Sequence, residues 1–259
     1  MRHRYGRVGD AGGAERRWHQ RIQFEQHADR WLGGGRSQRR VAAGSFVTAT
    51  ATDPDGNTSE FAGCIEVIGC SATPQPGCLS GFGSARLSVS DKKPGKESLK
   101  IGLSKGPAFS GDALGNPLAA GGTDYFVCIY DGAGALAQQY TVARAGDSCA
   151  GKPCWSNVGP IPPGDPGHKG YKYKDALVTA DGIAGMSLRP GALGASKVGV
   201  KGKNNTAKAQ TSLPTGVAAA LAGSTSVVVQ LIGSDAPSCV SESLGSVSRD
   251  DGVSFKASN

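Results

Sequence analysis

The amino-acid sequence predicts an all-β protein whose main part is an antiparallel β-sandwich. Short apolar runs alternate with polar residues at a period of two, which is the pattern of strands that bury one face. No run keeps helical spacing over twelve residues. The 40 glycines and 14 prolines of the 259-residue chain fall between these runs without a collagen repeat, and they therefore indicate frequent turns.

The predicted strands lie in residues 84–259, which we expect to form one sandwich module, immunoglobulin-like or jelly-roll-like. In the segments GYKYKD and KVGVKGK, lysines alternate with tyrosines or valines, so that one face is charged and the other apolar. A short helix, Val217–Ala222, is expected to cover an open end of the sandwich. Eight short apolar runs recur between the glycines and prolines of this region: Ala85–Val89, Ser98–Leu103, Tyr125–Tyr130, Leu136–Val142, Gly170–Tyr173, Gly185–Leu188, Lys197–Val200 and Ser226–Ile232.

Residues 1–42 differ in composition from the rest of the chain. They hold ten arginines, no lysine and four acidic residues, whereas residues 43–259 hold eighteen basic and seventeen acidic residues. No apolar core of a secretory signal follows the arginines. We expect this segment to be disordered and to come from an out-of-frame or mis-called start. The alternative is an arm whose guanidinium groups pair with phosphates, but we do not expect nucleic acid as a partner.

Residues 43–70 are predicted to be a terminal β-hairpin, the remnant of an upstream domain. Residues 46–51 alternate as a strand does, and Asp53–Asn57 combines residues that favour a tight turn. The segment TATDPDGNTSEF, residues 50–61, resembles the closing strands of bacterial immunoglobulin-like repeats and of right-handed β-helix repeats of the CSLREA type. The resemblance implies an upstream β-rich domain of the same protein. Residues 71–83 are expected to be a linker.

The predicted turn also has some features of a calcium loop. Asp53, Asp55 and Asn57 have the alternate spacing of its oxygen ligands. The later positions do not fit, because Thr58 stands where such a loop needs glycine and Cys64 stands where it needs glutamate. A hairpin turn without a cation is therefore the preferred interpretation, and we expect neither a metal site nor a cofactor.

The cysteines predict disulfides. No two of them form a CxxC pair, and their spacing does not suit a zinc site. We expect a bridge between Cys149 and Cys154, and a second between Cys128 and Cys239. The pairing of Cys64, Cys70 and Cys78 stays open, and one of the seven cysteines must remain odd. Disulfides in a glycine-rich β protein indicate an oxidising compartment, so we expect a secreted or cell-surface location.

No catalytic residue is predicted. The segment GDSCAGK, residues 146–152, matches seven positions of a phosphate-binding loop, but Pro153 stands in place of the required serine or threonine. His168 lies in a glycine- and proline-rich loop near Asp165, where a solvated histidine is the simpler interpretation. Neither a GxSxG nor an HExxH motif occurs. We therefore do not expect an enzyme.

Five short motifs lie along residues 84–259: FVCIYD at 126–131, CAGKPCW at 149–155, GYKYKD at 170–175, VGVKGKN at 198–204 and VVVQLIGSDAPSC at 227–239. With them this region resembles a C-terminal module of unknown function found in secreted multidomain bacterial proteins. Val240 departs from the aromatic residue expected after the last motif. The resemblance implies an all-β, extracellular, auxiliary domain, and it brings no catalytic residue or ligand.

The most prominent candidate surface is basic, since residues 169–208 hold eight basic and two acidic residues. Lysines on a sheet protect edge strands from aggregation, or they can bind polysaccharide or another anionic cell-envelope polymer. Trp155 could stack on a sugar ring if it were exposed. The candidate binding residues are Trp155, Lys172, Lys174, Lys197, Lys201 and Lys203.

These observations predict a non-catalytic, structural or adhesive module of a secreted or cell-surface bacterial protein. The alternative is a module that binds carbohydrate or an anionic polymer, and exposure of Trp155 would favour that alternative. We expect no membrane span, because no stretch reaches the eighteen or so apolar residues that a spanning helix needs.

Overall fold

The computed structural model describes residues 69–259, together with the backbone of four two-residue strands before them: β1 (Gln23–Phe24), β2 (Phe46–Val47), β3 (Ala49–Thr50) and β4 (Ile65–Glu66). Strand β2 pairs with β4 in antiparallel fashion, as a hairpin within residues 43–70 requires. Strand β1 pairs with β3, so one short element lies inside the segment predicted to be disordered. The predicted turn, with Asp53, Asp55 and Asn57, lies outside the described residues.

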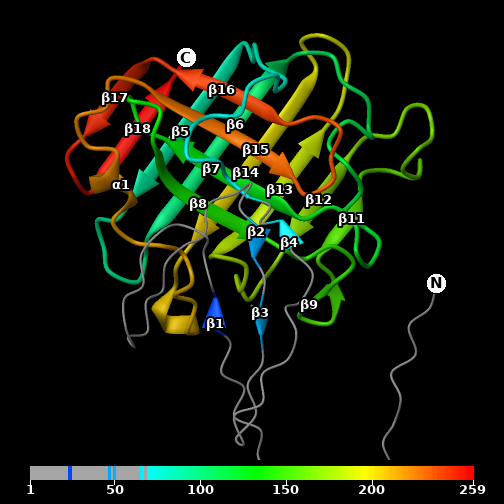
Figure 1. Ribbon diagram of the computed structural model, residues 1–259, viewed down its shortest axis with the longest axis horizontal. Helices are drawn as coiled ribbons and strands as arrows, with labels where there is room; N and C mark the ends of the chain where they lie inside the picture. The colour runs from blue at the N-terminus through cyan, green and yellow to red at the C-terminus, as the bar shows by residue number, and fades with distance from the viewer. Residues whose placement is uncertain (1–22, 25–45, 48, 51–64, 67–68) are drawn as a thin grey trace, which may run out of the picture. The chain divides into compact units, whose positions relative to one another are not determined.

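Residues 69–259 form two antiparallel sheets, which confirms the predicted all-β sandwich. The larger sheet has the order β11-β12-β13-β14-β6-β5-β18-β17, and the smaller has the order β16-β15-β7-β8. Figure 1 shows that the strands of the two sheets run in crossing directions. The larger sheet consists of β5 (Ser84–Ser90), β6 (Ser98–Gly106), β11 (Trp155–Asn157), β12 (Tyr171–Lys174), β13 (Ile183–Arg189), β14 (Ser196–Lys203), β17 (Ser246–Asp250) and β18 (Ser254–Ser258).

All eight apolar runs that were predicted to be strands are strands. The smaller sheet consists of β7 (Tyr125–Tyr130), β8 (Leu136–Val142), β15 (Val227–Gly233) and β16 (Val240–Leu244). A separate short hairpin is formed by β9 (Ser148–Cys149) and β10 (Lys152–Pro153). The alternation in the sequence did not predict this hairpin or the strands β11, β16, β17 and β18, because these strands are short or carry few apolar residues.

The core lies between the two sheets. The ring of Trp155 lies between those of Tyr125 and Tyr173, at centroid distances of 5.1 and 5.0 Å. The helix α1 (Val217–Ala220) contacts β8 of the smaller sheet and β5 and β18 of the larger sheet, and Val217 and Leu221 are buried. It therefore covers one open side of the sandwich, as predicted, with bounds two residues shorter. A 3-10 helix, η1 (Thr206–Lys208), lies in the loop after β14.

Residues 70–82, which we call the strap, run along the outer face of the smaller sheet. The side chain of Gln230 on β15 accepts a hydrogen bond from the Gln75 N–H at 3.0 Å and donates one to the Gln75 carbonyl at 2.8 Å. Phe82, at the end of the strap, is 1% exposed and belongs to the core. In place of the linker expected at 71–83, the structure has a segment fastened to the module by partners distant in sequence.

Three disulfides occur within residues 69–259: Cys70–Cys128, Cys78–Cys239 and Cys149–Cys154. The predicted bridge between Cys149 and Cys154 is confirmed. The predicted bridge between Cys128 and Cys239 is wrong, although both cysteines are disulfide-bonded. Each meets a cysteine of the strap instead, because Cys128 faces outward on β7 and the Leu79 N–H donates to the Cys239 carbonyl. Cys64 lies outside the described residues.

The described part of the chain contains no helix with the length and apolar character that crossing a bilayer requires.

Candidate functional site

The outward face of the larger sheet carries a dense set of cations, which we call the basic face. Alternation along each strand buries the apolar side chains and leaves the cations exposed. None of the strands β12, β13, β14, β6, β5 and β18 contains an aspartate or a glutamate. The basic face consists of Arg86, Lys100, Lys172, Lys174, Arg189, Lys197, Lys201, Lys203 and Lys256, all of them exposed.

Cations of the basic face lie directly opposite one another. Lys201 on β14 faces Lys100 on β6, and Arg189 on β13 faces Lys197 on β14. Like charges at directly opposite positions destabilise a sheet. The ion pairs within residues 69–259 are Arg144–Asp147 and Arg249–Asp251, so no carboxylate of these residues neutralises a member of the basic face. The face is therefore a surface of uncompensated positive charge.

The five lysines predicted to bind a ligand all belong to this face. The other four cations were not predicted. Arg189 lies on β13 between the lysine-rich segments, whereas Arg86, Lys100 and Lys256 come from β5, β6 and β18, which are distant in sequence from them. Protection of edge strands does not explain the face, since the edges of the larger sheet are β11 and β17 and all of these cations lie on strands between them.

One end of the basic face is hollowed. A depression of about 510 Å³ is lined by Lys169, Arg189 and Lys197, together with the hydroxyl-bearing Ser187 and the apolar Pro190 and Ala195. Three cations and one hydroxyl around a hollow without a carboxylate suit an anionic group.

The structure corrects the prediction for Trp155. This side chain is 3% exposed, and the neighbouring Tyr171 and Tyr173 are each 1% exposed. Burial raises the pKa of Tyr171 to about 12, as expected for a phenol that water does not reach. The three aromatic rings belong to the core, so they offer no surface on which a sugar ring could stack.

A second depression, of about 440 Å³, gathers His168 with Ser110, Asp112 and Asp165. The His168 Nε2 lies 2.6 Å from the Oδ1 of Asn157. The Asn157 amide nitrogen donates to the carbonyls of two neighbouring loop residues, which fixes Oδ1 as an acceptor and the His168 Nε2 as a donor. This nitrogen is therefore used to close the loop.

The remaining contacts of His168 do not build a catalytic relay. Its Nδ1 is buried without a hydrogen-bond partner and lies against Gly111, where a Cβ would come within 2.3 Å of it. No hydrogen bond joins His168 to Ser110, and the Asp112 Oδ1 accepts a hydrogen bond from the Gly164 N–H at 3.0 Å. A catalytic triad needs a serine and an acid on the two ring nitrogens, and here Nε2 contacts Asn157 and Nδ1 has no hydrogen-bond partner.

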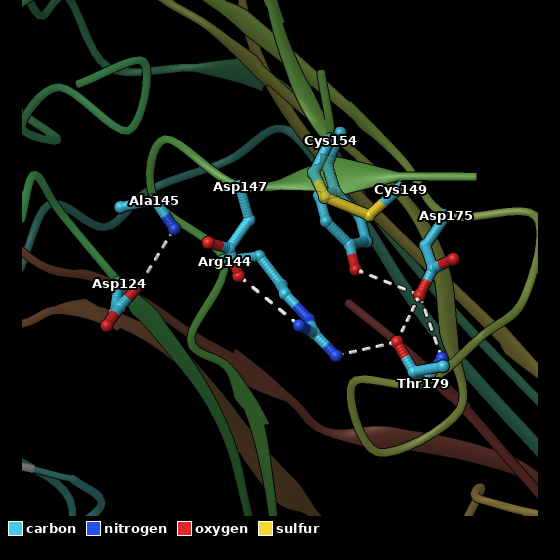
Figure 2. A network of polar contacts seen from close by, with 9 residues as sticks. Asp124, Arg144, Ala145, Asp147, Cys149, Cys154, Asp175 and Thr179 are labelled. Carbon is cyan, nitrogen blue, oxygen red and sulfur yellow. Dashed lines mark hydrogen bonds and ion pairs between the residues drawn. A yellow bond between two sulfur atoms is a disulfide. The ribbon is translucent and has the colours of Figure 1, made fainter. Parts of the chain in front are cut away.

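Figure 2 shows a third polar cluster, beside the Cys149–Cys154 disulfide. Asp175 accepts hydrogen bonds from the N–H of Leu177 and from both the N–H and the hydroxyl of Thr179, at 2.8, 2.8 and 2.9 Å. Arg144 donates to the Thr179 hydroxyl at 2.7 Å and pairs with Asp147 at 3.2 Å. These groups satisfy one another and hold the loop after β12.

Within residues 69–259, no cluster of histidine, cysteine, aspartate or glutamate has the arrangement needed to hold a metal ion. No protein-family model, curated protein or solved structure matches the chain. The basic face is therefore the feature of the described residues that most strongly indicates a function.

Proposed function

We propose that this protein is a non-catalytic, adhesive module of a secreted or cell-surface bacterial protein, and that it binds acidic polysaccharide through the basic face. One observation carries the proposal. The nine exposed cations of the basic face lie on six adjacent strands that contain no acidic residue. The bacterial context and an upstream β-rich domain come from the sequence resemblances.

The arrangement of charge favours a ligand over a role in solubility alone. A surface that only keeps a protein soluble carries both signs of charge interspersed. Here the opposition of Lys201 and Lys100 costs stability. An anionic polymer over the face would offset this repulsion and would be attracted by the summed field of the cations.

Two observations favour polysaccharide over nucleic acid. Proteins that bind single-stranded nucleic acid stack its bases on aromatic side chains, and the outward positions of the six strands carry no aromatic residue. Three disulfides also suit an oxidising compartment, where envelope polysaccharides occur. Burial of Trp155 argues against a neutral sugar bound by stacking.

The proposal predicts that polygalacturonate binds to the immobilised protein and that neutral dextran does not. In the double variant Lys100→Glu/Lys201→Glu, we expect the affinity for polygalacturonate to fall about tenfold, because two favourable charge contacts become repulsive. Surface plasmon resonance at low and at physiological salt measures both affinities.

The matched control is Lys152→Glu/Lys208→Glu, which makes the same change of charge at exposed positions outside the basic face. We expect this control to bind nearly as well as the unmodified protein. Equal binding of dextran and polygalacturonate, or equal losses in the two double variants, would contradict the proposed function.

A further inference from the structure

Two glycines lie directly opposite each other at the centre of the basic face, Gly199 on β14 and Gly102 on β6. Glycine inside a strand destabilises it relative to alanine, and it often marks a place where a ligand approaches the backbone closely. Neither glycine has a positive φ. A Cβ added at Gly102 would meet nothing within 4 Å, and one added at Gly199 would meet only the Ile101 carbonyl, at 3.9 Å.

The fold therefore has no packing or conformational need for glycine at these two positions. Gly202, three residues further along β14, is different. It is buried, and a Cβ there would come within 2.7 Å of Leu213. The inward glycine is required by packing, whereas Gly102 and Gly199 leave an unoccupied strip on an exposed face.

The pairing register of the strands places cations around this strip. The row that crosses the sheet through the two glycines has Lys172 on β12 and Arg86 on β5 at the ends of its uncharged central stretch. These ends are four strand spacings apart, or about 19 Å. One side of the row is flanked by Lys201 and Lys100.

The other side of the row is flanked by Lys197, which faces Ser104. Within the row, Ser187 on β13 lies between Lys172 and Gly199. We call the row formed by Ser187, Gly199 and Gly102, with its cationic surround, the trough. Serine hydroxyls on its floor and side can donate to and accept from the hydroxyls of a sugar.

We propose that the trough holds a linear acidic polysaccharide that runs across the strands, with its sugar rings over the backbone of Gly199 and Gly102 and its carboxylates beside the flanking lysines. The inference rests on the proposed function and adds the class and direction of the ligand. A compact anion would contact one side of the trough only, whereas its length of about 19 Å suits several sugar residues in an extended chain.

The proposal is tested with variants whose side chains fill the trough and leave its charges unchanged. In the double variant Gly102→Val/Gly199→Val, branched side chains occupy open space and favour strand structure, so the melting temperature should stay equal or rise. We expect its affinity for polygalacturonate to fall about tenfold or more, because the backbone is no longer accessible. The single variant Gly102→Ala, whose Cβ meets nothing within 4 Å, should show a smaller loss.

The matched control is Ser90→Val, an outward position of β5 that lies two rows away from the glycines. We expect it to bind like the unmodified protein. The glycine variants are compared with Lys100→Glu/Lys201→Glu in this test. If they bind like the unmodified protein while the lysine variant does not, the proposal that the ligand lies in the trough is wrong and the proposed function stands. If the unmodified protein binds duplex DNA more tightly than polygalacturonate at equal salt, the assigned ligand class is wrong.

Discussion

Single buried carboxylates hold loops of this molecule in place. Asp175 is 2% exposed and Glu97 is 4% exposed. Glu97 accepts hydrogen bonds from the Gly95 N–H at 2.8 Å and from the Asn204 amide at 2.7 Å. Burial alone raises the pKa of each carboxyl, but the hydrogen bonds to the charged form outweigh burial and lower the pKa of both. Both groups therefore favour the folded state while they are ionised.

The substitution Asp175→Asn should lower the free energy of unfolding by about 2 kcal/mol at neutral pH, because the amide replaces one acceptor with a donor that faces the Thr179 N–H. Since folding lowers the pKa of Asp175, its stabilisation is complete above the ordinary carboxyl pKa of about 4 and is lost as the pH falls below that value. The difference between variant and unmodified protein should therefore shrink in acid.

Urea unfolding at a series of pH values measures this difference. Asp147→Asn is the matched control, because it removes a half-exposed partner of Arg144 in the same cluster (Figure 2), and we expect a change below about 1 kcal/mol. A difference for Asp175→Asn that stayed constant from neutral pH to about pH 3 would show that its charge does not stabilise the fold.

At the scale of elements, strand β7 explains why the strap is part of the module. Val127 and Ile129 face the main core, whereas Phe126, Cys128 and Tyr130 face the other side and form a second apolar cluster with Cys70. A strand buried on both faces has a continuous apolar sequence, and FVCIY is such a run. The outer side of the smaller sheet therefore needs a cover, and the strap is fastened over it by disulfides.

Replacing both Cys78 and Cys239 with serine should destabilise the protein more than replacing both Cys149 and Cys154. The first bridge spans 161 residues and the second spans 5. By the loop-entropy relation, these separations correspond to about 5 kcal/mol and about 2 kcal/mol. Unfolding by denaturant without reductant gives both values. Equal losses would mean that the long bridge does not restrict the unfolded chain.

At the scale of the whole molecule, residues 69–259 contain a core, a cover for its outer face and three internal disulfides. The basic face belongs to the same unit, since six adjacent strands supply it. These features meet the requirements of an independently folding domain. We therefore expect the boundary of the module to lie before the strap, in place of the boundary at residue 84 that the sequence predicts.

We expect a fragment comprising residues 69–259 to fold, to form three disulfides and to unfold in one transition. A matched fragment of residues 84–259 lacks Cys70, Cys78 and Phe82, so two cysteines lose their partners and the second apolar cluster loses its cover. This shorter fragment should aggregate or unfold at a lower temperature. Calorimetry and mass spectrometry after thiol alkylation distinguish the two outcomes. Equal stability of the two fragments would place the boundary at residue 84.

The sequence by itself determined the features that depend on neighbouring residues. A period of two between apolar and polar residues gave the strands Tyr125–Tyr130 and Leu136–Val142 with their observed bounds, and spacing over a short loop gave the Cys149–Cys154 bridge. The alternation also placed Lys172 and Lys174 on an exposed face. Each of these predictions needed only the geometry of a single strand or turn.

The tertiary structure decided everything that depends on which strands are neighbours. The order of the larger sheet places Lys100 opposite Lys201 and Gly102 opposite Gly199, although these strands are about a hundred residues apart. It also turns Trp155 into the core. The period of a strand states which side chains share a face, but the pairing of strands distant in sequence is fixed by the burial of the whole core, which no local pattern contains.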